Sequence, residues 1–223
     1  MVNYTKKYVD IYSPFVYYYV NNNESGSEHI MKQSFKAIDI TFIALFVALM
    51  AIGANVTSYI TVGTVPLSMQ PFFAVLAGAL LGRKRGAIAM IVYLLIGLIG
   101  LPVYAGFKSG LGAVIGPTGG FIIAFPFVSY FTGLIIEKGN ANKLSTFMTA
   151  SFVGLVITYV VGTTHLWASL KYLAESDISY MGAWAGMALF IPKDIIFTIF
   201  AGALAPRIYR AMNRSTNKNA VAH

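Results

Sequence analysis

The sequence predicts an all-α integral membrane protein with six transmembrane helices and both termini in the cytoplasm. Of its 223 residues, 57% are apolar and only 11% are charged, whereas about a quarter of the residues in a soluble domain are charged. So few charges cannot cover the surface of a water-soluble protein of this size, which excludes a soluble globular fold. Because one span takes about 20 residues, the chain has room for about five to seven spans.

The first thirty residues differ from the rest of the chain. The apolar run at residues 11–20 is too short to span a membrane. It also lacks the basic start and small-residue cleavage site of a secretory signal. We therefore expect residues 1–30 to form a mobile or weakly interfacial extension, residues 31–214 the six-helix membrane domain, and residues 215–223 a polar C-terminal tail.

Six apolar segments, separated by short basic or Gly/Pro-rich breaks, predict the helices: residues 37–55, 67–82, 86–100, 119–137, 145–169 and 181–210. The second and third would be only about 24 and 22 Å long, shorter than the hydrocarbon core of about 30 Å. Their missing length must lie on the outer side, where residues 100–120 are rich in glycine. Irregular backbone at that depth must line a cavity or be buried in protein, which predicts a hollow that opens outward.

The basic residues orient these helices. With a cytoplasmic N-terminus, thirteen of the sixteen Lys and Arg residues fall in segments on the inner side, and only Lys108, Lys171 and Lys193 fall outside. An excess of Lys and Arg on the cytoplasmic side is the usual signature of membrane topology. The net charge of +8 therefore reflects orientation in the membrane and gives no support to nucleic-acid binding.

The chain lacks the residues that most enzymes and metal sites need. It has no cysteine and three histidines, which excludes disulfides, thiolate chemistry and Cys-ligated metals and leaves no set of metal ligands. The sequence contains no G-x-x-x-x-G-K-[ST] phosphate loop, no H-E-x-x-H and no G-x-S-x-G. We therefore expect no catalytic residue, no metal and no cofactor in this chain.

The sequence Gly116-Pro-Thr-Gly-Gly120 stands immediately before the fourth apolar segment. Thr118 can serve as the N-cap of that helix, and the amides of Gly119 and Gly120 would then give a positive helix end for a carboxylate or carbonyl oxygen. A glycine-lined turn that lets helices pack closely is the alternative, and the sequence does not separate the two.

Asp194 is the only acidic residue in the last long apolar segment, and it follows Pro192 and Lys193. Proline and an acid favour the first helical turn, so the spanning helix is predicted to begin near Pro192, after a half-helix at residues 181–191. Ionisable groups inside membranes usually indicate function. Adjacent residues lie about 100° apart on a helix, so Lys193 and Asp194 should not both face the hollow. We expect Asp194 to be the one that does. The alternatives are a pairing of Lys193 with Asp194, or Lys193 reaching the outer interface.

Further candidates are individually weaker. Lys108, in the glycine-rich segment, can clamp an anionic ligand or simply be solvated. Gln70 and Tyr93, on the two short helices, can supply amide and hydroxyl groups to a polar ring. Ala44 and Ala48 form a small-xxx-small pair on the first helix, which allows another helix to approach closely, either within the protein or in a partner.

Four stretches of the chain form a recognisable series: Val65-Pro-Leu-Ser-Met-Gln70-Pro71, Leu81-Gly-Arg-Lys-Arg-Gly86, Ile99-Gly-Leu-Pro-Val-Tyr-Ala-Gly106 and residues 112–120. Together they resemble the BioY family, the biotin-specific S components of energy-coupling factor (ECF) transporters. The resemblance covers about residues 35–210 and leaves out residues 1–30. It implies a prokaryotic, multi-pass cell-membrane protein for vitamin uptake that binds biotin from the outer side. It further implies docking through Ala44 and Ala48 onto a transmembrane coupling subunit, with two cytoplasmic ATPase subunits using ATP.

The chain departs from the family in one place. The family often shows Pro-Gly-Asp-x-x-Lys at the start of the last helix, where the acid and the lysine contribute to biotin recognition. In this chain the acid is Asp194 and the lysine position is occupied by Phe197. Lys193 or Lys108 would then have to supply the cation for the carboxylate of biotin.

The resemblance also implies roles for the other candidates. Asp194 would accept from the ureido N–H groups of biotin. Thr118 and the amides of Gly119 and Gly120 would donate hydrogen bonds, and Tyr104 and Phe107 would form the walls of the cavity. An S component for another small vitamin and a stand-alone biotin facilitator remain as alternatives.

Overall fold

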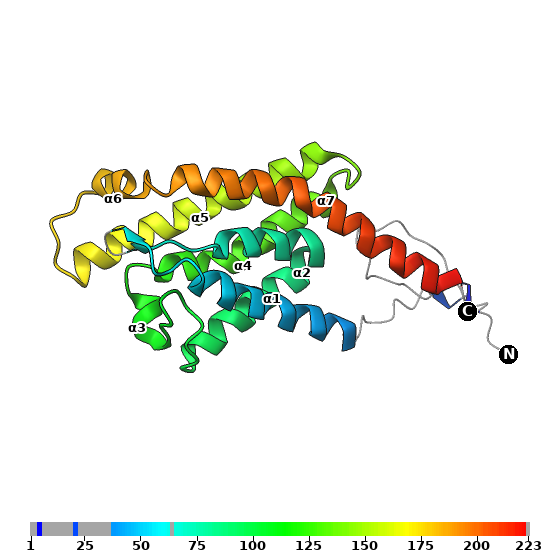
Figure 1. Cartoon of the computed structure of the whole chain (residues 1–223), viewed down its shortest axis with the longest axis horizontal. Helices are drawn as coiled ribbons and strands as arrows, with labels where there is room; N and C mark the ends of the chain where they lie inside the picture. The colour runs from blue at the N-terminus through cyan, green and yellow to red at the C-terminus, as the bar shows by residue number, and fades with distance from the viewer. Residues whose placement is uncertain (1–3, 6–19, 22–36, 63–64, 222–223) are drawn as a thin grey trace.

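The computed structural model describes residues 4–5, 20–21, 37–62 and 65–221, and these are almost entirely helical (Figure 1). The helices are α1 (Ala37–Asn55), α2 (Gln70–Leu98), α3 (Gly110–Ile115), α4 (Gly119–Lys138), α5 (Leu144–Tyr172), α6 (Tyr180–Met187) and α7 (Ile191–Val221). Two antiparallel pairs of two-residue strands, β1 (Tyr4–Thr5) with β2 (Val20–Asn21) and β3 (Thr61–Val62) with β4 (Val65–Pro66), complete the described elements.

Four helices are long and apolar enough to cross a membrane: α1, α4, α5 and the part of α7 up to Met212. The predicted all-α, multi-pass membrane protein is therefore confirmed. The count of six spans and the cytoplasmic position of both termini stay predictions. The proposed extension at residues 1–30 lies almost wholly outside the described residues, which include only β1 and β2 from it.

Helix α2 is a hairpin of two short helices. Gly82, with φ 80° and ψ 171°, breaks it into residues 70–81 and 83–98, about 18 and 24 Å long at 1.5 Å per residue. Only glycine adopts such a positive φ readily. A Cβ at Gly86 would lie 2.9 Å from the Ala77 carbonyl oxygen, so the two halves touch directly after the turn. Two short helices at this place were predicted, but the connection between them is a single residue.

The basic residues after Gly82 fasten this turn to its neighbours. Arg85 Nη2 lies 3.1 Å from Oδ2 of Asp39, which is buried at the start of α1. Arg83 Nε lies 3.1 Å from Glu137 Oε2, at the end of α4, and the Arg83 backbone N–H donates to Glu137 Oε1 at 2.8 Å. The start of α1, the turn in α2 and the end of α4 therefore lie at one end of the bundle.

Figure 1 shows the α4–α5 connection and the C-terminal half of α7 at this same end, while α3, α6 and the link between α1 and α2 lie at the opposite end. The basic segments around residues 83–85, 138–143 and 207–210 are thus gathered on one side of the bundle. A positive-inside topology requires this arrangement.

The last predicted helix, residues 181–210, is divided. Helix α6 ends at Met187 and α7 begins at Ile191, so the predicted start of the spanning helix near Pro192 is confirmed. Its predicted end near residue 210 is wrong, because α7 continues to Val221. No glycine or proline follows Pro206 to stop it.

Close backbone contact between α2 and α4 depends on small residues. The Ser129 hydroxyl of α4 donates to the Ala74 carbonyl of α2 at 2.6 Å. A Cβ on Gly78 would collide with the Ser129 backbone. Small residues permit this approach, which in a bilayer maximises dispersion contacts between helices.

Gly78→Ala should therefore destabilise the protein. The added methyl group meets backbone that cannot move alone, and such overpacking typically costs about 1–3 kcal/mol, which corresponds to a melting temperature lower by about 3–10 °C. The measurement is thermal unfolding in detergent. Gly186→Ala in α6 is the matched control, because a Cβ at that position would have no other group within 4 Å. Equal melting temperatures for the two variants would contradict the close α2–α4 contact.

Candidate ligand-binding site

A pocket of about 600 Å³, its open mouth included, lies among α2, α4, α5 and the α6–α7 junction. Its walls are mostly apolar, with a few polar groups. The lining residues are Val65, Pro66, Ser68, Gln70, Pro71, Ala105, Thr118, Phe121, Ile122, Phe125, Thr158, Tyr159, Met187, Phe190, Lys193 and Asp194.

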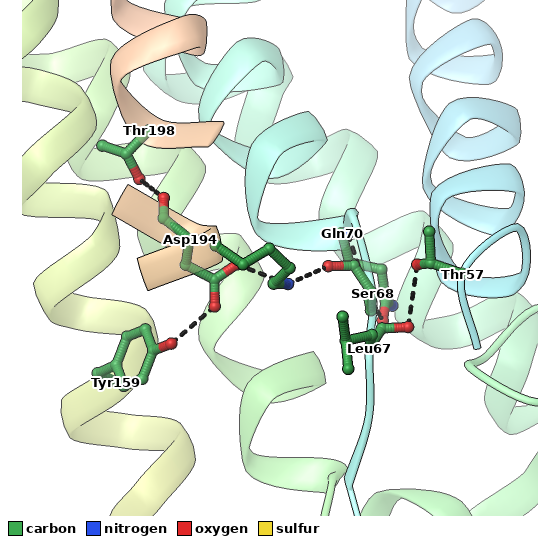
Figure 2. A network of polar contacts seen from close by, with 8 residues as sticks. Thr57, Leu67, Ser68, Gln70, Tyr159, Asp194 and Thr198 are labelled. Atoms are coloured by element: carbon green, nitrogen blue, oxygen red, sulfur yellow. Dashed lines mark hydrogen bonds and ion pairs between the residues drawn. The ribbon is translucent and has the colours of Figure 1, made fainter. Parts of the chain in front are cut away.

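Lys193 and Asp194 are the charged residues of this lining, and they pair with each other (Figure 2). Lys193 Nζ lies 2.8 Å from Asp194 Oδ1 and also donates to the Ser68 carbonyl at 2.8 Å. Asp194 lines the pocket, as expected, but Lys193 lines it too, and the pairing of the two that was the alternative is also observed. The four-methylene chain of lysine lets its ammonium fold back toward the neighbouring carboxylate despite the 100° between adjacent positions.

Asp194 is also held by three residues outside this pair. The Tyr159 hydroxyl on α5 donates to Asp194 Oδ2 at 2.7 Å, so each carboxylate oxygen has a donor. The Asp194 backbone N–H donates to the Phe190 carbonyl at 3.1 Å, and the Thr198 hydroxyl donates to the Asp194 carbonyl at 2.6 Å. The acid is therefore fixed in both backbone and side chain.

Gln70 and Tyr93 are hydrogen-bonded to each other, and only Gln70 lines the pocket. Ser68 Oγ donates to Gln70 Oε1 at 2.8 Å, Gln70 Nε2 donates to the Tyr93 hydroxyl at 2.8 Å, and that hydroxyl donates to the Val103 carbonyl at 2.9 Å. Tyr93 is fully buried. It stands behind Gln70 and links the pocket wall to the segment between α2 and α3.

That segment, residues 99–109, contributes Ala105 to the pocket lining. Tyr104 and Phe107 do not line the pocket, so the expectation that they wall it is not met. Tyr104 is buried and its hydroxyl donates to the Leu94 carbonyl at 2.6 Å. Burial raises the pKa of Tyr104 to about 12, so this hydroxyl keeps its proton at neutral pH. Phe107 is 57% exposed, and its backbone N–H donates to Asn55 Oδ1 at 2.7 Å.

Lys108 is exposed and also lies outside the lining. Its backbone carbonyl accepts from the Tyr104 N–H at 3.0 Å in an isolated bridge. Of the two lysines considered for an anionic ligand, Lys193 is therefore the one at the pocket.

Thr118 lines the pocket and precedes α4, but its side chain makes no capping hydrogen bond. Its φ and ψ of −92° and −5° are helical, whereas a capping side chain needs an extended N-cap backbone. Gly119 and Gly120 do not line the pocket, because a Cβ would strike the Val114 carbonyl at the first and the His165 side chain at the second. Here the glycines allow close packing, which was the alternative interpretation.

Ala44 and Ala48 both lie on the exposed side of α1, together with Ile40, Leu45 and Ile52. Their small side chains therefore face away from the bundle. The described residues contain no group of three or more His, Cys, Asp or Glu side chains that could hold a metal ion.

Long apolar helices around a mostly apolar pocket with one partly buried acid–lysine pair define a multi-pass membrane protein with a small-molecule site. The chain belongs to the BioY family, whose model matches residues 31–214. The resemblance noted from the sequence is confirmed.

Similar proteins come from bacteria and an archaeon. BioYB of Bacillus subtilis is 42% identical over 193 residues, which cover 85% of this chain and 96% of that protein. BioY of Pyrococcus horikoshii is 36% identical over 173 residues, 78% of this chain and 97% of its own length. Biotin transporter BioY of Thermotoga maritima is 36% identical over 178 residues, 80% and 96% of the two chains.

A crystal structure of the S-component for biotin from an ECF-type ABC transporter has the same fold. It superimposes with a TM-score of 0.68 at 25% identity and covers 79% of this chain and 95% of its own. The family consists of membrane transport components, so the chain is a multi-pass membrane transport protein and not an enzyme.

Several residues of the pocket were not predicted from the sequence: Tyr159, Ser68 and the aromatic wall made by Phe121, Phe125 and Phe190. The phenylalanines carry no signal that separates pocket wall from ordinary core. Tyr159 did carry one, since a hydroxyl in the middle of a predicted apolar span needs a polar partner. Asp194 was the available buried acceptor.

Proposed function

We propose that this chain is the biotin-binding, substrate-capture S component of an ECF-type vitamin uptake transporter, and that its pocket beside Asp194 and Lys193 is the biotin site. The observation that carries the proposal is the partly buried Lys193–Asp194 pair in a mostly apolar pocket of a BioY-family chain. The names of the relatives and of the structural neighbour support biotin as the ligand.

The chemistry of biotin suits this lining. Its ureido ring carries two N–H donors and one carbonyl acceptor, its thioether ring and alkyl chain are apolar, and its carboxylate is anionic. The pocket offers a carboxylate acceptor at Asp194, amide and hydroxyl groups at Gln70 and Thr118, aromatic walls and the ammonium of Lys193. A few polar groups in an apolar cavity are what fix the orientation of a small ligand.

Lys193 takes the place of the lysine that the family resemblance puts at position 197. The two positions are four residues apart on α7, hence on the same face. Lys193 Nζ lies 5.9 Å from the centroid of the Phe197 ring, within cation–π range. The ammonium thus sits above the side chain that replaces the family lysine, where it can bind the carboxylate of biotin.

The proposed partners are a transmembrane coupling subunit and two cytoplasmic ATPase subunits that hydrolyse ATP. The exposed Ala44–Ala48 face of α1 would dock onto the coupling subunit, because small residues let helix backbones approach closely. Lys108, Gly119 and Gly120 lie outside the pocket lining, so direct contact between them and biotin is not part of this proposal.

Asp194→Asn should raise the Kd for biotin about tenfold or more. The amide keeps the shape of the side chain but loses the charge that strengthens hydrogen bonds from ligand N–H groups. Isothermal titration calorimetry in detergent measures the effect. Asp177→Asn, in the exposed segment before α6, is the control. Unchanged affinity in folded Asp194→Asn protein would remove Asp194 from the site.

Lys193→Gln should reduce the preference for biotin over biotinamide, its neutral amide, about fivefold or more. The variant loses the ammonium that distinguishes a carboxylate from an amide. The measurement is the ratio of the two Kd values, because a general loss of protein stability would lower the affinity for both ligands equally and leave this ratio unchanged. Lys171→Gln, at the exposed end of α5, should keep the wild-type ratio. A retained preference in Lys193→Gln would assign the carboxylate to another group.

Two experiments separate the alternatives. Titration against a panel of small vitamins should show binding of biotin alone; tighter binding of another vitamin would indicate an S component of different specificity.

Liposomes containing only this chain should take up no biotin beyond one molecule per protein, whereas liposomes with the coupling and ATPase subunits should accumulate it when ATP is supplied. Sustained uptake by the chain alone would identify a stand-alone facilitator.

A further inference from the structure

Tyr159 is a pocket residue of α5 to which neither the sequence pattern nor the proposed function gives a role. It is 7% exposed and packs with Met187, the last residue of α6, and with Phe190, in the turn before α7. Its hydroxyl donates to Asp194 Oδ2 at 2.7 Å (Figure 2). Tyr159 therefore joins α5 to the first turn of α7 through the acid that faces the pocket.

The two donors to Asp194 differ in how firmly they hold it. Lys193 has a flexible chain, and its ammonium is shared between Asp194 and the Ser68 carbonyl. A ligand anion that binds Lys193 would compete directly with Asp194. The Tyr159 ring turns about only two side-chain torsions and is packed in a buried apolar cluster, so its hydroxyl stays in place when Lys193 moves.

The hydrogen-bonding capacity of Asp194 then defines what it can bind. A carboxylate offers about four lone-pair sites. Tyr159 and Lys193 take one on each oxygen, which leaves about two for a ligand. These remaining sites accept and do not donate, so they select a group with N–H donors, such as a cyclic urea or amide.

We propose that Tyr159 is a positioning residue for the ligand site, which orients the Asp194 carboxylate so that its free lone pairs face N–H donors of the ligand. This proposal rests on the biotin site proposed above and adds a residue to it. Tyr159 acts through Asp194, so its hydroxyl matters only while the carboxylate is present.

A double-mutant cycle tests this dependence. Tyr159→Phe keeps the ring and removes the hydroxyl, and we expect it to raise the Kd for biotin about five- to thirtyfold, since hydrogen bonds to charged groups are among the stronger ones. In the Asp194→Asn background the same substitution should change the Kd less than about twofold. Tyr130→Phe, on α4 and outside the pocket lining, is the matched control and should bind as the wild type does.

Additive effects of the two substitutions, or an unchanged Kd in Tyr159→Phe protein, would overturn the positioning role. A purely structural role of Tyr159 predicts additivity, because the ring packing does not depend on the charge of Asp194. The rate at which biotin leaves, followed by displacement with labelled biotin, should rise in Tyr159→Phe and stay unchanged in Tyr130→Phe.

A second cycle without ligand separates this inference from the proposed function. Melting temperatures of the same four proteins in detergent should show non-additivity if Tyr159 and Asp194 interact. If the wild type failed to bind biotin while this coupling was present, the proposed ligand would be wrong and the contact would stand. Additive melting temperatures would overturn the contact whatever ligand the protein binds.

Discussion

The constraint on which this structure depends is that polar groups at membrane depth must find their partners inside the protein, because the hydrocarbon core offers none. The described helices satisfy their backbone groups within themselves, and nearly all buried polar side chains between them have a partner. Among the described residues, the buried side-chain atoms without one are Thr163 Oγ1 and His165 Nδ1. Ser129 donates to the Ala74 carbonyl, and Tyr93 lies between Gln70 and the Val103 carbonyl. Asp194 has a donor on each carboxylate oxygen. These pairings decide where helices can touch and where irregular backbone is tolerated.

The same constraint shapes the pocket. Its charged groups have protein partners without a ligand: the ammonium of Lys193 has two acceptors, and the carboxylate of Asp194 has two donors. A ligand that displaces one of these hydrogen-bond partners must therefore supply another in its place. A buried polar group that loses its partner without gaining another costs about 1–3 kcal/mol, so a molecule lacking the matching donors and acceptors is rejected. Selectivity in such a site comes from the arrangement of pairs more than from the apolar walls.

The sequence predicts the helices well because length and apolarity alone decide what can cross a bilayer. Each predicted start lies within three residues of the start of a described helix or of a helix half in α2. The start near Pro192 was predictable from the proline and the acid in one turn. The one-residue turn at Gly82 was not, because its tightness depends on the contact of Gly86 with Ala77, which lies across the hairpin.

Site residues were harder to predict, for a physical reason. A sequence shows which side chains can bind a ligand, and the fold decides which of them are already occupied. The Tyr104 hydroxyl already donates to the Leu94 carbonyl. The Val114 carbonyl lies against Gly119, in the space that a ligand would have to occupy. Tyr159 was overlooked because its partner comes from a helix 35 residues further along the chain. Only Asp194, Lys193, Gln70 and Thr118 among the predicted residues line the pocket.

The proposed biotin site places the cation on Lys193, whereas the family resemblance implies a lysine at the position that Phe197 occupies. Positions 193 and 197 are one helical turn apart, so a long side chain at the first can bring its ammonium over the second. Lys193 does so, with Nζ 5.9 Å from the Phe197 ring. The phenylalanine then contributes a π face that stabilises the cation, and the pair Lys193–Asp194 becomes sequence-adjacent. Because the Lys193 ammonium already lies 2.8 Å from Asp194 Oδ1, an anionic ligand that binds Lys193 must compete with that carboxylate.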